Sequence, residues 1–178
     1  TGGVPPGPYL STTRLHSFYD WSRRAMVEHY LDACVPVFPR GAAFECVFLN
    51  VNDTALLVTF DGSRPPWLPD ACCVFRRPHH PPAPAFLANL TKTLLPAPSP
   101  INGSAARWWR VDIPPPTGPF YYAFDEPFRP GERIYAAFDF PGIGGGWVSQ
   151  NFHSVTLERP PASTWALPAA CGADPAAV

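Results

Sequence analysis

Five cysteines carry the clearest covalent chemistry in this chain: Cys34, Cys46, Cys72, Cys73 and Cys171. Cysteine zinc sites usually need matched C-x-x-C pairs, and that spacing is absent. Disulfide bonding is therefore preferred over metal or redox chemistry. Cys72 and Cys73 are adjacent, so on a β-strand they point to opposite faces and take different partners. The odd cysteine is either a buried thiol or a link to another chain.

Three asparagines stand in the acceptor pattern for N-linked glycans: Asn52, Asn89 and Asn102. Three such patterns in a short chain, together with the cysteines, predict a secreted or lumenal glycoprotein. The chain opens at Thr1 without Met or a hydrophobic signal region. We therefore interpret it as a mature product whose signal peptide has been removed.

Patterns for catalysis or cofactor binding are missing. The run Gly142–Gly146 does not match G-x-G-x-x-G or a P-loop, and a strand is expected after it, so the glycines are assigned to a hairpin. Neither G-x-S-x-G nor H-E-x-x-H occurs. His79 and His80 have no ligand partner at useful spacing and predict an exposed loop, whereas His29 is interpreted as a satisfied buried histidine. We predict no enzyme activity, no metal and no cofactor.

The composition excludes two partner classes and favours β-structure. The 178 residues carry a formal net charge of −1, with both signs mixed, which argues against binding to nucleic acid or an anionic membrane. No apolar run is long enough to span a membrane as a helix. Aromatic residues make up 14% of the chain and 26 residues are proline, which favours sheets over long helices.

Alternating apolar and polar residues predict two hairpins and a further strand in the first half. The first hairpin runs from Thr13 to Leu31 with its turn near Asp20–Arg23, and a helix over Ser22–Leu31 is the competing interpretation. The second spans residues 44–60 and turns at Asn52 and Asp53. A short strand follows over Cys72–Phe75.

The second half predicts further strands after one turn of helix within Phe86–Leu95. Alternation or aromatic runs mark strands over Trp108–Ile113, Phe120–Phe124, 133–140 and Trp147–Glu158, the last with a bulge after Phe152. The whole pattern amounts to about eight to ten strands, typical of an antiparallel sandwich or barrel.

The order of these elements resembles the ependymin-related secreted glycoproteins, whose fold is like that of bacterial lipoprotein carriers. The resemblance rests on Ala43–Asn50, Ala55–Phe60, the Cys72-Cys73 strand, Arg107–Asp112 and the Trp-x-x-Pro-x-x-Cys ending at Cys171. It implies strongly curved antiparallel sheets, as a half-barrel or sandwich with little helix. It also implies that Cys171 bonds to Cys72 or Cys73. The odd cysteine number departs from the family, and so does the segment Arg76–Pro82, which we call the Pro/His loop.

The resemblance sets the expected domain boundaries and a ligand site. We expect a Pro/Gly-rich N-terminal segment over residues 1–12, a single β domain over 13–171 and a flexible tail over 172–178. The family's apolar pocket takes lipid or another hydrophobic ligand. Large and small inward-facing side chains from neighbouring strands could line such a pocket here, and a filled core is the alternative. The candidates are Trp109, Val111, Tyr122, Phe124, Ile134, Ala136 and Phe138.

Three functions fit these observations. The first is a secreted, non-catalytic protein that binds a hydrophobic, lipid-like ligand in the concave sheet. The second is a structural subunit of an extracellular or lumenal assembly, which contacts its protein partners through Pro-rich loops, an unpaired cysteine and an exposed aromatic surface. The residues expected to form that surface are Trp67, Trp108, Trp147 and Trp165. The third is a pathogen's secreted decoy on a β-sandwich.

Overall fold

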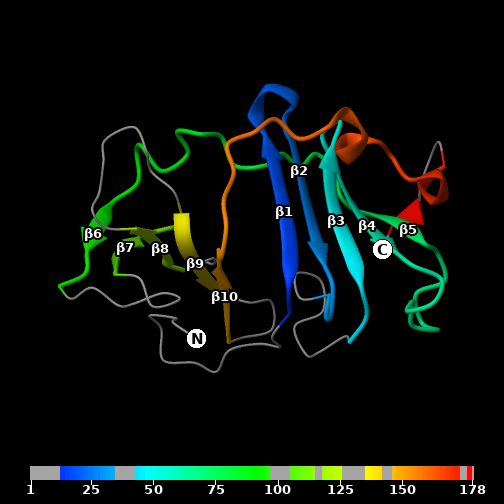
Figure 1. The fold of residues 1–178 in the computed structure, drawn as a ribbon, viewed down its shortest axis with the longest axis horizontal. Helices are drawn as coiled ribbons and strands as arrows, with labels where there is room; N and C mark the ends of the chain where they lie inside the picture. The colour runs from blue at the N-terminus through cyan, green and yellow to red at the C-terminus, as the bar shows by residue number, and fades with distance from the viewer. Residues whose placement is uncertain are drawn as a thin grey trace. The chain divides into compact units, whose positions relative to one another are not determined.

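A computed structural model describes residues 13–34, 43–96, 105–114, 118–125, 135–141, 146–172 and 176–177. The predicted fold class is confirmed, because the described residues form two antiparallel β-sheets and only three short 3-10 turns (Figure 1). The predicted N-terminal segment lies outside the described residues, as do residues 173–175 and 178 of the predicted tail, whereas Ala176–Ala177 form a strand paired with the first sheet. Contacts within the chain gather into two compact units, one containing Ala85–Leu157 and the other Ser11–Pro84 and Glu158–Val178.

The first sheet has the strand order β1-β2-β3-β4-β5-β11. Its strands are β1 (Leu15–Asp20), β2 (Ala25–Tyr30), β3 (Cys46–Val51), β4 (Thr54–Thr59), β5 (Cys72–Arg76) and β11 (Ala176–Ala177). The strands from β1 to β5 pair antiparallel, and β11 pairs parallel to β5. The 3-10 turns of this unit are η1 (Trp21–Arg23), η2 (Ala162–Trp165) and η3 (Ala169–Cys171).

The second sheet has the strand order β10-β9-β8-β7-β6, and all neighbours are antiparallel. Its strands are β6 (Lys92–Leu94), β7 (Ala106–Val111), β8 (Phe120–Asp125), β9 (Tyr135–Pro141) and β10 (Trp147–Asn151). In the described part of the chain, neither sheet closes into a barrel.

Turn chemistry explains both hairpins of the first sheet. The Asp20 carboxylate accepts the backbone N–H of Ser22 at 2.9 Å, and Arg24 takes a left-handed φ of 48° before β2 begins. The prediction of a strand rather than a helix after Ser22 is thus confirmed. Asn52 and Asp53 have φ values of 50° and 58°, the left-handed pair that a two-residue hairpin turn requires.

The C-terminal segment covers one face of the first sheet. Cys72 bonds to Cys171, with 4.7 Å between their Cα atoms. Trp165 joins the same buried cluster, whose other members come from β2 to β5: Ala25, Val27, Leu49, Val51, Leu56 and Val58. The bond between Cys171 and the vicinal pair, which the family resemblance implies, is present, and Cys72 is the partner. Cys73 points to the other face as a buried thiol.

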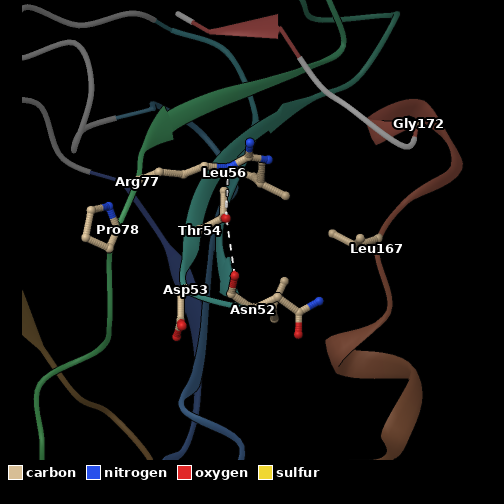
Figure 2. Close-up of a pocket in the computed structure, with 9 residues that line it drawn as sticks. Asn52, Asp53, Thr54, Leu56, Arg77, Pro78, Leu167 and Gly172 are labelled. Atoms are coloured by element: carbon tan, nitrogen blue, oxygen red, sulfur yellow. Dashed lines mark hydrogen bonds between the residues drawn. The ribbon is translucent and has the colours of Figure 1, made fainter.

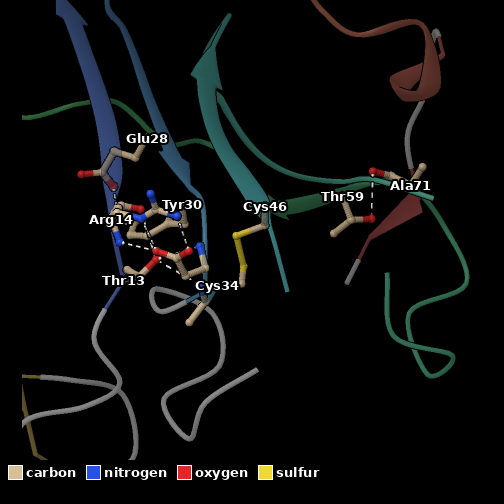
Figure 3. Close-up of a disulfide and its surroundings, with 10 residues drawn as sticks. Thr13, Arg14, Glu28, Tyr30, Cys34, Cys46, Thr59 and Ala71 are labelled. Carbon is tan, nitrogen blue, oxygen red and sulfur yellow. Dashed lines mark hydrogen bonds and ion pairs between the residues drawn. A yellow bond between two sulfur atoms is a disulfide. The ribbon is translucent and has the colours of Figure 1, made fainter. Parts of the chain in front are cut away.

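A second disulfide lies beside the open end of the first hairpin (Figure 3). Cys34 follows β2 and bonds to Cys46 at the start of β3. Nearby, the Arg14 guanidinium donates two hydrogen bonds to the Asp32 carboxylate, at 2.9 and 2.8 Å, and these hold the pKa of Asp32 at about 2. Because both side chains are exposed, this ion pair contributes little to stability, and the disulfide is the main constraint here.

Two elements of the second half differ from the prediction. Residues 84–89 form successive turns rather than a helix, and β6 follows them. The last long strand ends at Asn151 rather than Glu158, because among the described residues β10 lies at the sheet edge and its pairing with β9 stops at Asn151 and Ala137. The final backbone bond there runs from Phe152 N–H to the Ala136 carbonyl. The predicted bulge after Phe152 is therefore wrong, and residues 153–158 are exposed outside the ladder.

We expect the two disulfides to stabilise the protein unequally. The Cys72–Cys171 bond spans 99 residues and the Cys34–Cys46 bond spans 12. In the loop-entropy description, a ~100-residue loop contributes about 4.7 kcal/mol and a ~15-residue loop about 3 kcal/mol. Urea unfolding of the double variants C72A/C171A and C34A/C46A should show the larger loss for the former. Equal losses would contradict this account.

Thiol titration tests the state of the odd cysteine. The structure places one unbonded thiol, Cys73, in the interior at 3% exposure. Unreduced native protein should react slowly with a thiol reagent, and unreduced protein in denaturant should expose one thiol per chain. A count of zero would show that Cys73 is linked to another chain.

Candidate functional site

Aromatic side chains line one face of the second sheet. The register places Trp109 opposite Tyr122 and Tyr122 opposite Phe138, and side chains two residues along each strand share their face. We call this the aromatic face and define it by Trp109, Val111, Phe120, Tyr122, Phe124, Phe138 and Phe140. It runs across β7, β8 and β9.

The rings of the aromatic face pack on one another. Tyr122 stacks on Phe138 with centroids 4.8 Å apart, and Phe138 stacks on Phe140 at the same distance. Phe86 contacts the edge of Tyr122 from the turn before β6. Val111 and Tyr122 are buried, whereas Trp109, Phe124 and Phe138 keep part of their surface exposed. The rings therefore fill much of the space between themselves and still present apolar surface.

Five of the seven predicted ligand-binding residues meet on this face: Trp109, Val111, Tyr122, Phe124 and Phe138. Ile134 lies outside the described residues. Ala136 differs from the prediction, because β9 has a register shift that pairs Ala137 with Ala123 and Tyr135 with Phe124. Ala136 is left between these pairs and packs in the cluster of Trp108. Simple alternation along β9 misses this shift.

The cluster around Trp108 is a packed core of the second unit. Trp108 is fully buried, so the prediction that it belongs to an exposed aromatic surface is wrong, as it is for the buried Trp165 of the first unit. Trp108 packs with four alanines. They are Ala106, Ala123, Ala136 and Ala137. Small residues on the neighbouring strands leave room for the large indole, so this cluster binds the strands together and offers no open site.

A pocket of about 510 Å³ lies in the first unit, beside the β3–β4 turn (Figure 2). Its lining is Val51, Asn52, Asp53, Thr54, Leu56, Arg77, Pro78, Leu167 and Gly172. The Arg77 guanidinium donates to the Thr54 hydroxyl at 3.0 Å, and that hydroxyl donates to the Asn52 carbonyl at 3.3 Å. Sequence reasoning did not find this pocket, because Leu167 is distant in the sequence from the turn that it faces.

The Pro/His loop packs onto the same hairpin. His79 is half-buried, its Nδ1 bonds to the fully buried Asn50 amide, and its ring contacts the Phe48 ring edge-on. The prediction of an exposed loop is therefore wrong for His79, because Asn50 needs a polar partner in the interior. His80 is exposed and pairs with Asp53 at 2.9 Å.

Two other side chains that could do chemistry, those of His29 and Cys73, have structural partners. His29 bonds to Glu45 at 2.7 Å and is half-buried, in agreement with its interpretation as a satisfied histidine. Burial, reinforced by the nearby Asp70, raises the pKa of the Cys73 thiol, which keeps it protonated and weakly reactive. Within the described ranges, no three metal-ligating side chains gather, and no helix has the length and apolar character to cross a membrane.

Acid should weaken the docking of the Pro/His loop. Burial, with the charges of Arg76 and His80, lowers the pKa of His79. The unfolded chain takes up a proton near the ordinary value of about 6.5, whereas the folded chain resists protonation until lower pH. Stability from neutral His79 is therefore present above about pH 6.5 and is lost as the pH falls below it.

Urea midpoints measured from about pH 7.5 to about pH 5 should fall, and less steeply in the His79→Gln variant. His153→Gln, at an exposed histidine of the other unit, is the control. An unchanged pH slope in His79→Gln would contradict the assignment.

No protein-family model, curated protein or solved structure matches this chain. The resemblance to ependymin-related glycoproteins therefore stays a prediction that rests on short motifs. The antiparallel sheets, the two disulfides, the aromatic face and the pocket beside the β3–β4 turn are the structural facts on which a function can be argued.

Proposed function

We propose that this chain is a secreted or lumenal, non-catalytic glycoprotein that binds a hydrophobic, lipid-like ligand on the aromatic face. The observation that carries the proposal is the cross-strand row of Trp109, Tyr122 and Phe138, in which the buried Tyr122 stacks on Phe138 while Trp109 and Phe138 stay partly exposed. An ordered, partly exposed apolar surface of this kind favours an apolar partner.

Burial of the remaining apolar surface would drive binding. Each Å² of apolar surface removed from water contributes about 25 cal/mol, so a ligand that covers several half-exposed rings gains a few kcal/mol. Trp109 is paired with Leu94 on β6, which is 43% exposed and extends the surface toward the sheet edge. Stacked rings are already fixed in place, so little side-chain entropy is lost when a ligand docks.

Three features support the proposed extracellular or lumenal location and the proposed class of non-catalytic glycoprotein. Two disulfides are compatible with an oxidising extracellular or lumenal environment. Asn52 and Asn89 are exposed, as glycan acceptors must be. A non-catalytic role is supported by the structural pairing of titratable groups, such as His29 with Glu45. The family resemblance adds lipid binding as the expected ligand class.

A structural role in an assembly is the second candidate, and one observation favours it. Trp67 is 57% exposed within a proline-rich loop, and its ring contacts Phe44 edge-on. A pre-ordered loop that presents an indole is suited to protein contact. A protein partner would then occupy exposed aromatic surface in place of a small ligand.

Ligand binding is tested with full-length protein secreted from eukaryotic cells. Organic extracts should contain lipid by mass spectrometry, and a fluorescent fatty acid should bind the delipidated protein. Trp109→Ala should weaken that binding roughly tenfold, the factor that about 1.4 kcal/mol of lost contact produces. Trp67→Ala, an exposed tryptophan of the other unit, is the matched control.

Clean extracts together with identical affinity in Trp109→Ala would refute the ligand proposal. Light scattering of the same samples examines the second candidate. An oligomer that dissociates in Trp67→Ala would favour the assembly role, and a monomer at all concentrations would oppose it.

A further inference from the structure

The pocket beside the β3–β4 turn includes a predicted glycan acceptor in its own lining. Asn52 is exposed and lines the pocket together with Leu167, a hydrophobic residue that remains 47% exposed. Figure 2 shows the side chains of Asn52 and Leu167 extending from opposite sides into the same space. A group attached to the Asn52 amide would therefore begin inside the pocket.

We infer that Asn52 carries an N-linked glycan and that its first sugar residues lie in this pocket, against Leu167. The inference rests on the secretory location in the proposed function and does not depend on the hydrophobic ligand. The attached sugar is the occupant because attachment gives it a high effective concentration at the pocket, which a free ligand lacks.

The chemistry of the lining suits an N-acetylated sugar. Leu167 offers apolar surface to the C–H face of a sugar ring and its acetyl methyl group, and the mostly buried Val51 and Leu56 form the apolar floor beside it. Arg77 brings hydrogen-bond donors to the same lining. The volume of about 510 Å³ falls in the range of ~300–1,000 Å³ that is typical of small-ligand sites. Such mixed lining would hold a sugar better than a purely apolar molecule.

The conformation of the hairpin turn accounts for an asparagine at position 52, but it does not account for a threonine at position 54. Asparagine is favoured at a left-handed turn position whether or not it is glycosylated. Thr54 completes the acceptor pattern, and in the folded chain its hydroxyl is already bonded to Arg77 and to the Asn52 carbonyl. Because Thr54 is only 9% exposed in the folded chain, we expect the oligosaccharide transferase to recognise this acceptor pattern before β4 folds.

The transfer step needs a lipid-linked oligosaccharide pyrophosphate as donor. The Asn52 amide nitrogen forms a bond to C1 of the first sugar, while the bond from C1 to the pyrophosphate oxygen breaks. The amide proton passes to a base of the transferase, and the pyrophosphate remains on the lipid. Folding then closes the C-terminal segment over the sugar, because the Cys72–Cys171 bond holds Leu167 and Gly172 beside the hairpin.

Native deglycosylation tests the inference on the full secreted chain. Peptide-N-glycosidase converts each glycosylated Asn to Asp, which peptide mass spectrometry measures site by site. Asn89 is the internal reference, because it is exposed in a turn and Thr91 beside it is also exposed. A sugar that is docked nine-tenths of the time should make Asn52 react about tenfold more slowly than Asn89 in native protein. In urea the two rates should agree.

Leu167→Ser should release the docked sugar and bring the native Asn52 rate close to the Asn89 rate. Leu157→Ser changes a leucine that is 88% exposed in the other unit and should leave both rates unchanged. Unmodified Asn52 in secreted protein overturns the inference, as do equal native rates at Asn52 and Asn89 in the wild-type chain. If Asn89 is unmodified, the rate at Asn52 in urea serves as the reference.

Clean organic extracts together with an unchanged affinity in Trp109→Ala would refute the ligand proposal and leave this inference standing. A slow native rate at Asn52 would support this inference whatever the extracts contain.

Discussion

The bond between Cys72 and Cys171 is the constraint on which the first unit depends. It holds the end of the chain against β5 and keeps Trp165 over the apolar face of β2 to β5. Without a cover, that face would expose valine and leucine side chains from four strands. An open β-sheet with an apolar face needs such a covering layer to be stable in water. The disulfide provides this covering layer by holding in place a C-terminal segment that has almost no regular secondary structure.

The other face of the same sheet is covered by the Pro/His loop, which hydrogen bonds rather than a disulfide hold in place. Asn50 is fully buried near the end of β3, and its side-chain amide nitrogen hydrogen-bonds to Nδ1 of His79 in the Pro/His loop. The backbone N–H of His79 also donates to the Asp53 carbonyl in the hairpin turn. These bonds fix a proline-rich segment that cannot pair as a strand. The β3–β4 hairpin is thus buried on both faces, and its turn remains accessible at the pocket.

The second unit is organised by side-chain size. On one face, alanines from neighbouring strands make room for the buried Trp108. On the other face, large rings occupy successive cross-strand positions and stack because no small residue separates them. The result is a packed core on one side and an aromatic surface with residual exposure on the other. This contrast is why the aromatic face, rather than the Trp108 cluster, is the candidate for ligand binding.

The sequence by itself determined the local features. Alternation placed most strands, Asn52 and Asp53 marked the hairpin turn, and adjacency put Cys72 and Cys73 on opposite faces, because each of these follows from strand periodicity or backbone preference over a few residues. Tertiary structure decided which cysteine meets Cys171, since only Cys72 lies on the face that the C-terminal segment covers. It also decided the burial of His79, the shift at Ala136 and the end of β10 at Asn151. Those outcomes depend on neighbours that are distant in the sequence, which local patterns do not contain.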